Sequence, residues 1–210
     1  MIFSTTSPGI PDHHTFSATP ASAPTYIAPV TRDQVAAAAF VEDPALLDQQ
    51  NSAFLDSCID TATALAWNMT GFEADPRTVE LRWGGDASPV TAFYSAWIRL
   101  SVWPVTSIDS VTLVDFDNNE VAVDVAATEL TAKPPKIRLD RSGIEHSREF
   151  SSMRIEATVG STDDAQRSPY AFAVAQAAAH MFLNRTAAGS PLADSGALAT
   201  LKRYRVGSVI

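Results

Sequence analysis

The chain is poor in the features that mark secreted, membrane-bound and nucleic-acid-binding proteins. Cys58 is the only cysteine in 210 residues, which excludes an internal disulfide. No apolar run reaches the length of about 20 residues that a membrane-spanning helix needs, and the first residues lack the basic and apolar regions of a signal peptide. Basic residues are also few: the sequence has 15 Lys and Arg against 24 Asp and Glu, which gives a net charge of −9. We therefore expect a soluble protein that contacts no membrane and has no general attraction for nucleic-acid phosphates.

Motifs for catalysis are also missing. The sequence has no phosphate-binding loop, no dinucleotide-binding glycine motif, no zinc-protease motif and no serine-hydrolase elbow. Residues 115–119, Asp-Phe-Asp-Asn-Asn, resemble the start of a calcium loop, but its sixth position is Glu120 instead of glycine and its twelfth is Ala126 instead of glutamate. This segment predicts a hairpin turn instead. We expect no catalytic residue, no metal site and no cofactor.

The alternative of a small hydrolase depends on two histidines. His146 lies between Glu145 and Ser147, but adjacent side chains point in different directions, so these three are not expected to form a catalytic set. His180 lies in an Ala-rich segment with no carboxylate three or four residues away, which favours a hydrogen-bonded interface histidine. Cys58 is expected to be a buried, unreactive thiol.

Residues 1–30 are predicted to form an extended arm. Five prolines stand among Ser, Thr and Ala, and such a composition buries too little apolar surface to form a core of its own. Two interpretations are open at this point. The arm is an unordered tail, or it orders against a neighbouring subunit through aromatic side chains, Phe16 and Tyr26.

Two helices are predicted after the arm. Thr31 is a suitable N-cap for a short helix that continues to Phe40. Asp43 and Pro44 together predict the start of a long helix, because proline at the first helical position loses no hydrogen bond. Apolar residues then recur at steps of three and four, which places them on one helix face up to a C-cap at Gly71.

Residues 77–160 are predicted to form an antiparallel β section. The segment Arg77–Trp83 alternates between polar and apolar residues, as do the stretches on either side of the turn at residues 117–119. The connections are too short for parallel crossovers. We expect five or six strands, with Pro104 at a sheet edge or at the start of a strand.

A third helix is predicted to start at Ser168–Pro169 and to end near Arg185. It is rich in alanine and apolar on nearly every face, so nearly every face must be covered. We expect part of this cover to come from a second copy, through an interface that includes Ala173, Ala177, His180 and Met181. A charge at Ala177 should then block assembly before it blocks folding.

These elements predict the α+β class, with a small bundle of three to four helices and an antiparallel β section inserted between the second and third long helices. Their order resembles the head-to-tail connector proteins of tailed bacteriophages and gene transfer agents, also called adaptor or head completion proteins. Four blocks show the resemblance: Pro29-Val-Thr-Arg-Asp-Gln-Val-Ala36, Ala62-Thr-Ala-Leu-Ala-Trp-Asn-Met-Thr-Gly71, Pro104-Val-Thr-Ser-Ile-Asp-Ser-Val-Thr112, and residues 173–185, which end in Leu-Asn-Arg. The resemblance covers residues 29–210. It departs from the family at Asn68, where an acidic residue is usual, and at Phe72, where arginine is frequent.

The resemblance implies a structural protein of the virion neck, assembled in the host cytoplasm, and not an enzyme. A connector domain over residues 31–210 would form a dodecameric ring beneath the portal protein, receive a stopper or tail terminator protein, and let genomic DNA pass without specific binding. A segment over residues 192–210 would dock to the portal through Lys202, Arg203, Tyr204 and Arg205, although a frayed, solvated terminus is the alternative for these residues. Another neck or tail completion protein of the virion is the alternative function.

Overall fold

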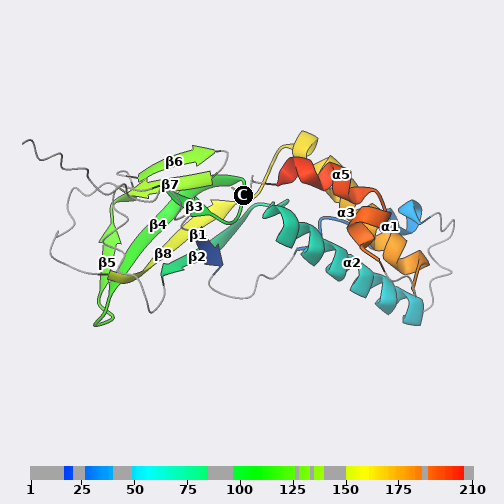
Figure 1. The fold of residues 1–210 in the computed structure, drawn as a ribbon, viewed down its shortest axis with the longest axis horizontal. Helices are drawn as coiled ribbons and strands as arrows, with labels where there is room; N and C mark the ends of the chain where they lie inside the picture. The colour runs from blue at the N-terminus through cyan, green and yellow to red at the C-terminus, as the bar shows by residue number, and fades with distance from the viewer. Residues whose placement is uncertain are drawn as a thin grey trace, which may run out of the picture.

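The described part of the chain forms two lobes, one of strands and one of helices, which lie end to end (Figure 1). The computed structural model describes residues 17–20, 27–39, 49–84, 97–125, 128–132, 135–139, 150–185 and 189–205. The helices are α1 (Arg32–Ala38), α2 (Gln49–Thr70), α3 (Asp164–Leu183), α4 (Pro191–Asp194) and α5 (Ala197–Leu201), followed by the 3-10 turn η4 (Lys202–Tyr204). Helices together with an antiparallel sheet agree with the predicted α+β class, and the short α4 and α5 add to the predicted bundle.

The described strands form one eight-stranded sheet with the order β5-β4-β8-β2-β1-β3-β7-β6. They are β1 (Ser17–Pro20), β2 (Arg77–Gly84), β3 (Ile98–Leu100), β4 (Val105–Asp115), β5 (Glu120–Val123), β6 (Thr128–Ala132), β7 (Pro135–Leu139) and β8 (Phe150–Val159). Pairs of neighbouring strands are antiparallel except for β1 with β3. Strands β2 to β8 lie between α2 and α3 in sequence, as predicted, but there are more than five or six strands, and β1 comes from the arm.

Local capping explains the ends of the first helices. The Thr31 hydroxyl accepts a hydrogen bond from the Gln34 N–H, and the Gln34 side chain accepts one from the Thr31 N–H, so both halves of a capping box are present. Helix α2 ends before Gly71, whose φ of 64° is the left-handed conformation of a C-cap. The predicted start of this helix at Asp43–Pro44 lies outside the described residues.

Helix α3 begins earlier than the sequence predicted. Its N-cap is Asp163, whose carboxylate accepts a hydrogen bond of 2.9 Å from the Ala165 N–H, and the predicted start at Ser168–Pro169 is therefore wrong. Pro169 lies within the helix and donates no hydrogen bond to the carbonyl of Ala165. The helix continues through the proline because the face that follows it is buried from Tyr170 onward.

The segment that resembles a calcium loop is a hairpin turn between β4 and β5. One oxygen of the Asp115 carboxylate accepts the backbone N–H of Asp117 at 2.9 Å and of Asn119 at 2.7 Å. Asn118 has a φ of 62°, which asparagine tolerates better than most residues. The carboxylate is thus used to form the turn, as predicted.

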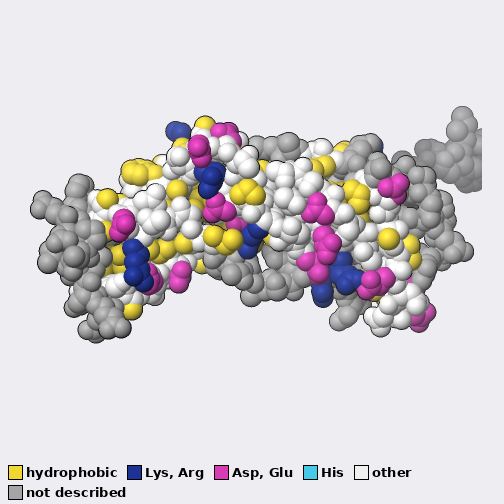
Figure 2. Space-filling view, turned by 180° about the vertical axis from the view of Figure 1, so that it is seen from behind, with side chains coloured by type: hydrophobic (Ala, Val, Ile, Leu, Met, Phe, Trp, Pro, Cys, Tyr) yellow, Lys and Arg dark blue, Asp and Glu magenta, His cyan; other side chains and the backbone are white. Residues whose placement is uncertain are grey.

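Each lobe has its own apolar core. In the sheet lobe, buried side chains from both halves of the sheet belong to one cluster, so the sheet curls around its own interior; they include Leu81, Ile98, Leu113, Ile137 and Ile155. In the helical lobe, a second cluster joins α1, α2, α3, α4 and α5. On the face shown in Figure 2, hydrophobic side chains lie among polar ones, and acidic and basic groups lie side by side on both lobes.

Backbone hydrogen bonds join the two lobes. The Trp103 N–H donates to the Gly71 carbonyl at 2.9 Å, and the Glu73 N–H donates to the Trp103 carbonyl at 2.8 Å. The Gly160 N–H donates to the Pro104 carbonyl at 2.9 Å, next to the start of α3. Because these bonds connect the end of α2, the start of β4 and the end of β8, they hold the helices in a set orientation to the sheet.

Candidate functional site

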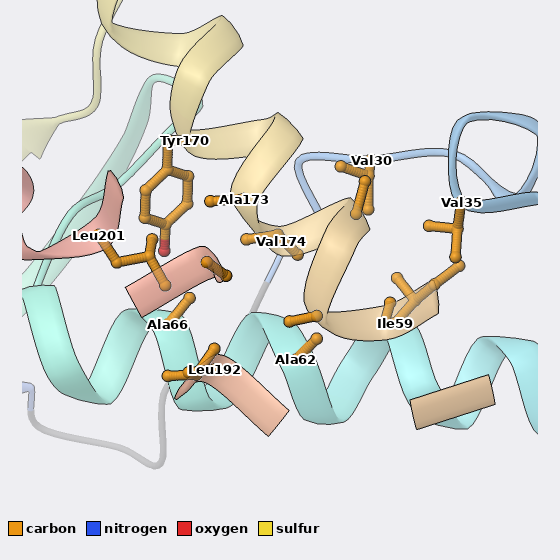
Figure 3. Close-up of a cluster of buried hydrophobic side chains, with 14 of the residues drawn as sticks. Val30, Val35, Ile59, Ala62, Ala66, Tyr170, Ala173, Val174, Leu192 and Leu201 are labelled. Atoms are coloured by element: carbon orange, nitrogen blue, oxygen red, sulfur yellow. The ribbon is translucent and has the colours of Figure 1, made fainter. Parts of the chain in front are cut away.

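The central face of α3 belongs to the chain's own core. Ala173 and Ala177 are 0% exposed and belong to the same buried cluster as Ala62 and Ala66 of α2, part of which is shown in Figure 3. The burial of Ala173 and Ala177 within the chain does not support the expected subunit interface at these two residues. The small side chains allow α3 to pack closely against helices of the same chain, and an aspartate at Ala177 would disrupt folding itself.

A different face of α3 remains uncovered by the described residues. Phe172 is 59% exposed and Leu183 is 57% exposed. They are eleven residues apart, which places them within about 20° of each other around the helix. Ala175 and Ala179, between them along the helix, are each 4% exposed and belong to the chain's own core. The side of α3 that carries the exposed Phe172 and Leu183, which we call the outer face of α3, thus presents two separate large apolar side chains.

A groove of about 590 Å³ lies beside this outer face, between α1 and the first half of α3. Its apolar lining includes Val30, Ala37, Ala38, Ala171 and Phe172. Its polar lining includes Gln34, Asp164 and Arg167. Arg167 is held by a 2.5 Å ion pair with Asp75. A lining that combines apolar residues with a few charged ones suits a protein–protein contact.

The two other predicted interface residues on α3 are half-buried at a second cavity. His180 and Met181 line this cavity of about 230 Å³ together with Cys58 and Asp194. The His180 Nδ1 atom lies 3.3 Å from the side-chain nitrogen of Asn184. Burial raises the pKa of the Cys58 thiol, so the reactive thiolate is disfavoured, in agreement with the predicted inert cysteine. The cavity therefore gives no support to a hydrolase.

Tyr204 is an anchor of the core and not a free contact residue. It is 7% exposed, and its hydroxyl donates a 2.5 Å hydrogen bond to the Gln166 carbonyl on α3. Its ring packs edge-on against Phe72 and Tyr170, with centroid distances of 4.8 Å and 5.3 Å. Burial raises the pKa of Tyr204, which keeps the phenol a hydrogen-bond donor. The side chain of Tyr204 is used inside the chain, so its burial does not support the expected portal contact through Tyr204 itself.

The three basic neighbours of Tyr204 are exposed. Lys202 and Arg203 belong to the turn η4, and Arg205 follows it. Because Tyr204 fixes this turn against α3, the three cations occupy a defined surface, which we call the C-terminal basic surface. Its exposure suits a contact with an acidic partner.

A buried ion pair at the lobe junction was not predicted from the sequence. The Glu73 side chain is 4% exposed and lies 2.5 Å from Arg77. Burial raises the pKa of Glu73, and the neighbouring Arg77 partly offsets this. In the sequence both residues belong to an ordinary polar segment, so only the folded structure identifies Glu73 as buried.

Other predicted site residues lie outside the described part of the chain, namely Phe16, Tyr26 and His146. Among the described residues, no group of three or more His, Cys, Asp or Glu side chains could hold a metal ion. In the same ranges, no helix has both the length and the apolar character to cross a membrane.

Phe172 and Leu183 were not predicted to be exposed apolar residues, although the sequence contains a signal for them. Their spacing of eleven residues marks one helix face, but the neighbouring alanines made every face of α3 equally apolar by sequence alone. Only the packing of α2, α1 and α5 distinguishes the covered faces from the outer one.

No protein-family model and no curated protein matches the sequence. Solved structures do match. A chain in the virion of a native gene transfer agent particle is 21% identical, with a TM-score of 0.64, over 92% of this chain and 97% of that one. A chain in the neck of the native particle, computed with C12 symmetry, is 20% identical over the same shares, with a TM-score of 0.53. A chain in the neck of an empty particle, computed with C6 symmetry, is 22% identical over 75% of this chain and 80% of that one, with a TM-score of 0.54. At these identities the chain shares its fold with components of gene transfer agent particles.

Proposed function

We propose that this chain is a structural protein of the neck of a phage-like particle. Copies of it form the connector ring between the portal and the stopper or tail protein, and the genomic DNA passes through the ring. The observation that supports this most is the shared fold, which extends over 92% of the chain to proteins in the virion and neck of gene transfer agent particles. Two of these neck structures have sixfold or twelvefold symmetry, which is what a closed ring requires.

The surfaces of the chain fit the parts of this role. The outer face of α3 and the adjoining groove supply an apolar contact for the next copy in the ring. The C-terminal basic surface supplies the contact for an acidic portal surface. A net charge of −9 per copy, repeated around the ring, lowers its affinity for DNA phosphates, so the DNA moves through without being held.

A substitution at Phe172 tests the ring contact. Because Phe172 is 59% exposed, Phe172→Asp should change the free energy of unfolding by no more than about 0.5 kcal/mol, as is usual for exposed positions. In the ring, however, the same charge would be buried against an apolar neighbour and should prevent closure. Circular dichroism measures folding, and native mass spectrometry measures assembly.

Phe172→Leu is the matched control, because it keeps the position apolar and should still form rings. Normal rings from Phe172→Asp would show that this face is not the contact between copies.

A further inference from the structure

The sheet is held together at its middle by a strand from the far N-terminal part of the chain. Strand β1 pairs antiparallel with β2, at Thr19↔Arg82 and Pro20↔Leu81, and parallel with β3, at Ser17↔Arg99 and Ala18↔Leu100. Strands β2 and β3 follow each other in sequence but do not pair with each other, since β1 lies between them. Without β1, the described strands form two separate groups, β5-β4-β8-β2 and β3-β7-β6.

The space between β2 and β3 is therefore a strand-binding slot. The residues of β2 and β3 that face it present backbone N–H and C=O groups that need a partner. A short strand satisfies groups on both sides at once. Its affinity comes from the backbone, so it needs no large side chains. The sequence of β1, Ser-Ala-Thr-Pro, has none.

We infer that, in the ring, this slot takes Ser17–Pro20 of a neighbouring copy, and that the N-terminal arm thereby links each copy to the next. This inference rests on the proposed ring function. Exchange of β1 between copies conserves the four residue pairs seen within one chain, so it costs little pairing energy. Only two pairs bind β1 on each side, whereas β2 and β8 pair continuously from Arg77↔Val159 to Gly84↔Ser152.

The length of the connecting segment limits the partner to an adjacent copy. Residues 21–26 separate β1 from Ile27, where the described chain leads into the helical lobe. Seven Cα steps span at most about 25 Å. The strand thus reaches a slot only on its own chain or on the copy beside it, as head-to-tail contacts around a ring require.

Disulfide trapping between two single-cysteine variants tests the inference. In a Cys58→Ala background, Thr19→Cys is placed on one protein and Arg82→Cys on another, and the two are assembled together into rings and oxidised. A disulfide between them forms only if β1 of one copy lies beside β2 of another. We expect a covalent dimer on non-reducing gels from the mixed rings, and chains longer than dimers from rings of the Thr19→Cys/Arg82→Cys double variant.

Two controls separate the possible failures. Mixed rings of Arg82→Cys and Arg154→Cys should give no dimer, because Arg82↔Arg154 is a pair within one chain. The unassembled Thr19→Cys/Arg82→Cys double variant should give an internal disulfide, which would show that these two cysteines can be oxidised to a disulfide. The exchange of β1 between copies would be overturned by two results together. The mixed rings would form normally but yield no Thr19–Arg82 dimer, and rings of the Thr19→Cys/Arg82→Cys double variant would yield only monomers with an internal disulfide. Failure of the wild-type protein to form rings would instead overturn the proposed function.

Discussion

At the scale of single residues, Tyr204 connects the end of the described chain to the lobe junction. Its ring lies among Phe72, Trp103 and Tyr170, and its hydroxyl bonds to the Gln166 carbonyl. Tyr204→Ala should therefore lower the free energy of unfolding by about 3 kcal/mol or more, since large aromatic residues lose both burial and contacts on truncation. Tyr204→Phe should cost about 1 kcal/mol, because it removes only the hydrogen bond. Urea denaturation measures both.

Lys202→Ala is the control for this prediction, because Lys202 is exposed two residues away in the same turn. It should change the stability by less than about 0.5 kcal/mol. If Tyr204→Ala cost no more than Lys202→Ala, Tyr204 would not be the anchor of the C-terminal basic surface.

Glu73 gives the chain a predictable dependence on pH. Because burial raises the pKa of Glu73 in the folded state, the folded chain binds more protons than the unfolded chain between the ordinary glutamate value of 4.5 and the raised value. Stability contributed by this group therefore falls as the pH rises through that window. Glu73→Gln should remove this part of the dependence, while its amide oxygen can still accept a hydrogen bond from Arg77.

The measurement is the unfolding free energy of wild type and Glu73→Gln at several pH values from 4 to 8. The variant should gain stability relative to wild type as the pH rises. A difference that stays constant over this range would contradict the assigned burial of Glu73.

At the scale of elements, the tight turn after β8 determines how α3 leaves the sheet. Gly160 has a φ of 112°, and a Cβ there would lie 2.3 Å from the Asp75 carbonyl oxygen. Gly160→Ala should therefore cost about 3 kcal/mol or more, because backbone strain and a steric clash with backbone act together. Gly196 has a φ of 79°, but a Cβ there would have no atom within 4 Å. Gly196→Ala should therefore lower the free energy of unfolding by only about 1 kcal/mol. Equal losses for the two variants would show that Asp75 does not press against Gly160.

The sequence identified the helices better than their ends and faces. Thr31 and Gly71 gave correct helix boundaries because their roles depend on neighbouring residues alone. Pro169 led to a wrong start for α3, because proline inside a helix is tolerated where tertiary burial outweighs one lost hydrogen bond. The interface expected at Ala173 and Ala177 finds no support for a related reason. An alanine in the sequence does not distinguish packing against a helix of the same chain from packing against a helix of a second copy.

The position of β1 could not be read from the sequence. Its four residues show no alternation of apolar and polar side chains, and its partners, β2 and β3, lie some 60 and 80 residues further along. Strand pairing over such separations depends on the finished sheet and not on local propensity. The sequence did predict the arm as extended and as a possible contact between subunits, but not the slot that receives it.

At the scale of the whole molecule, the two lobes carry different surfaces that the proposed ring would use. The helical lobe presents the outer face of α3 and the C-terminal basic surface, while the sheet lobe has its own core and contains the slot for β1. Hydrogen bonds around Gly71 and Trp103 fix the two lobes to each other. A fixed angle between lobes suits closure, because small errors in subunit angle add up around a ring.

Native mass spectrometry of the full chain, alone and with the portal protein of the same particle, measures whether the chain forms the proposed connector ring. We expect a closed ring of twelve copies bound to the portal, and we expect the binding to be lost when Lys202, Arg203 and Arg205 are changed to glutamate although the ring still forms. A chain that stays monomeric and does not bind the portal would contradict the proposal.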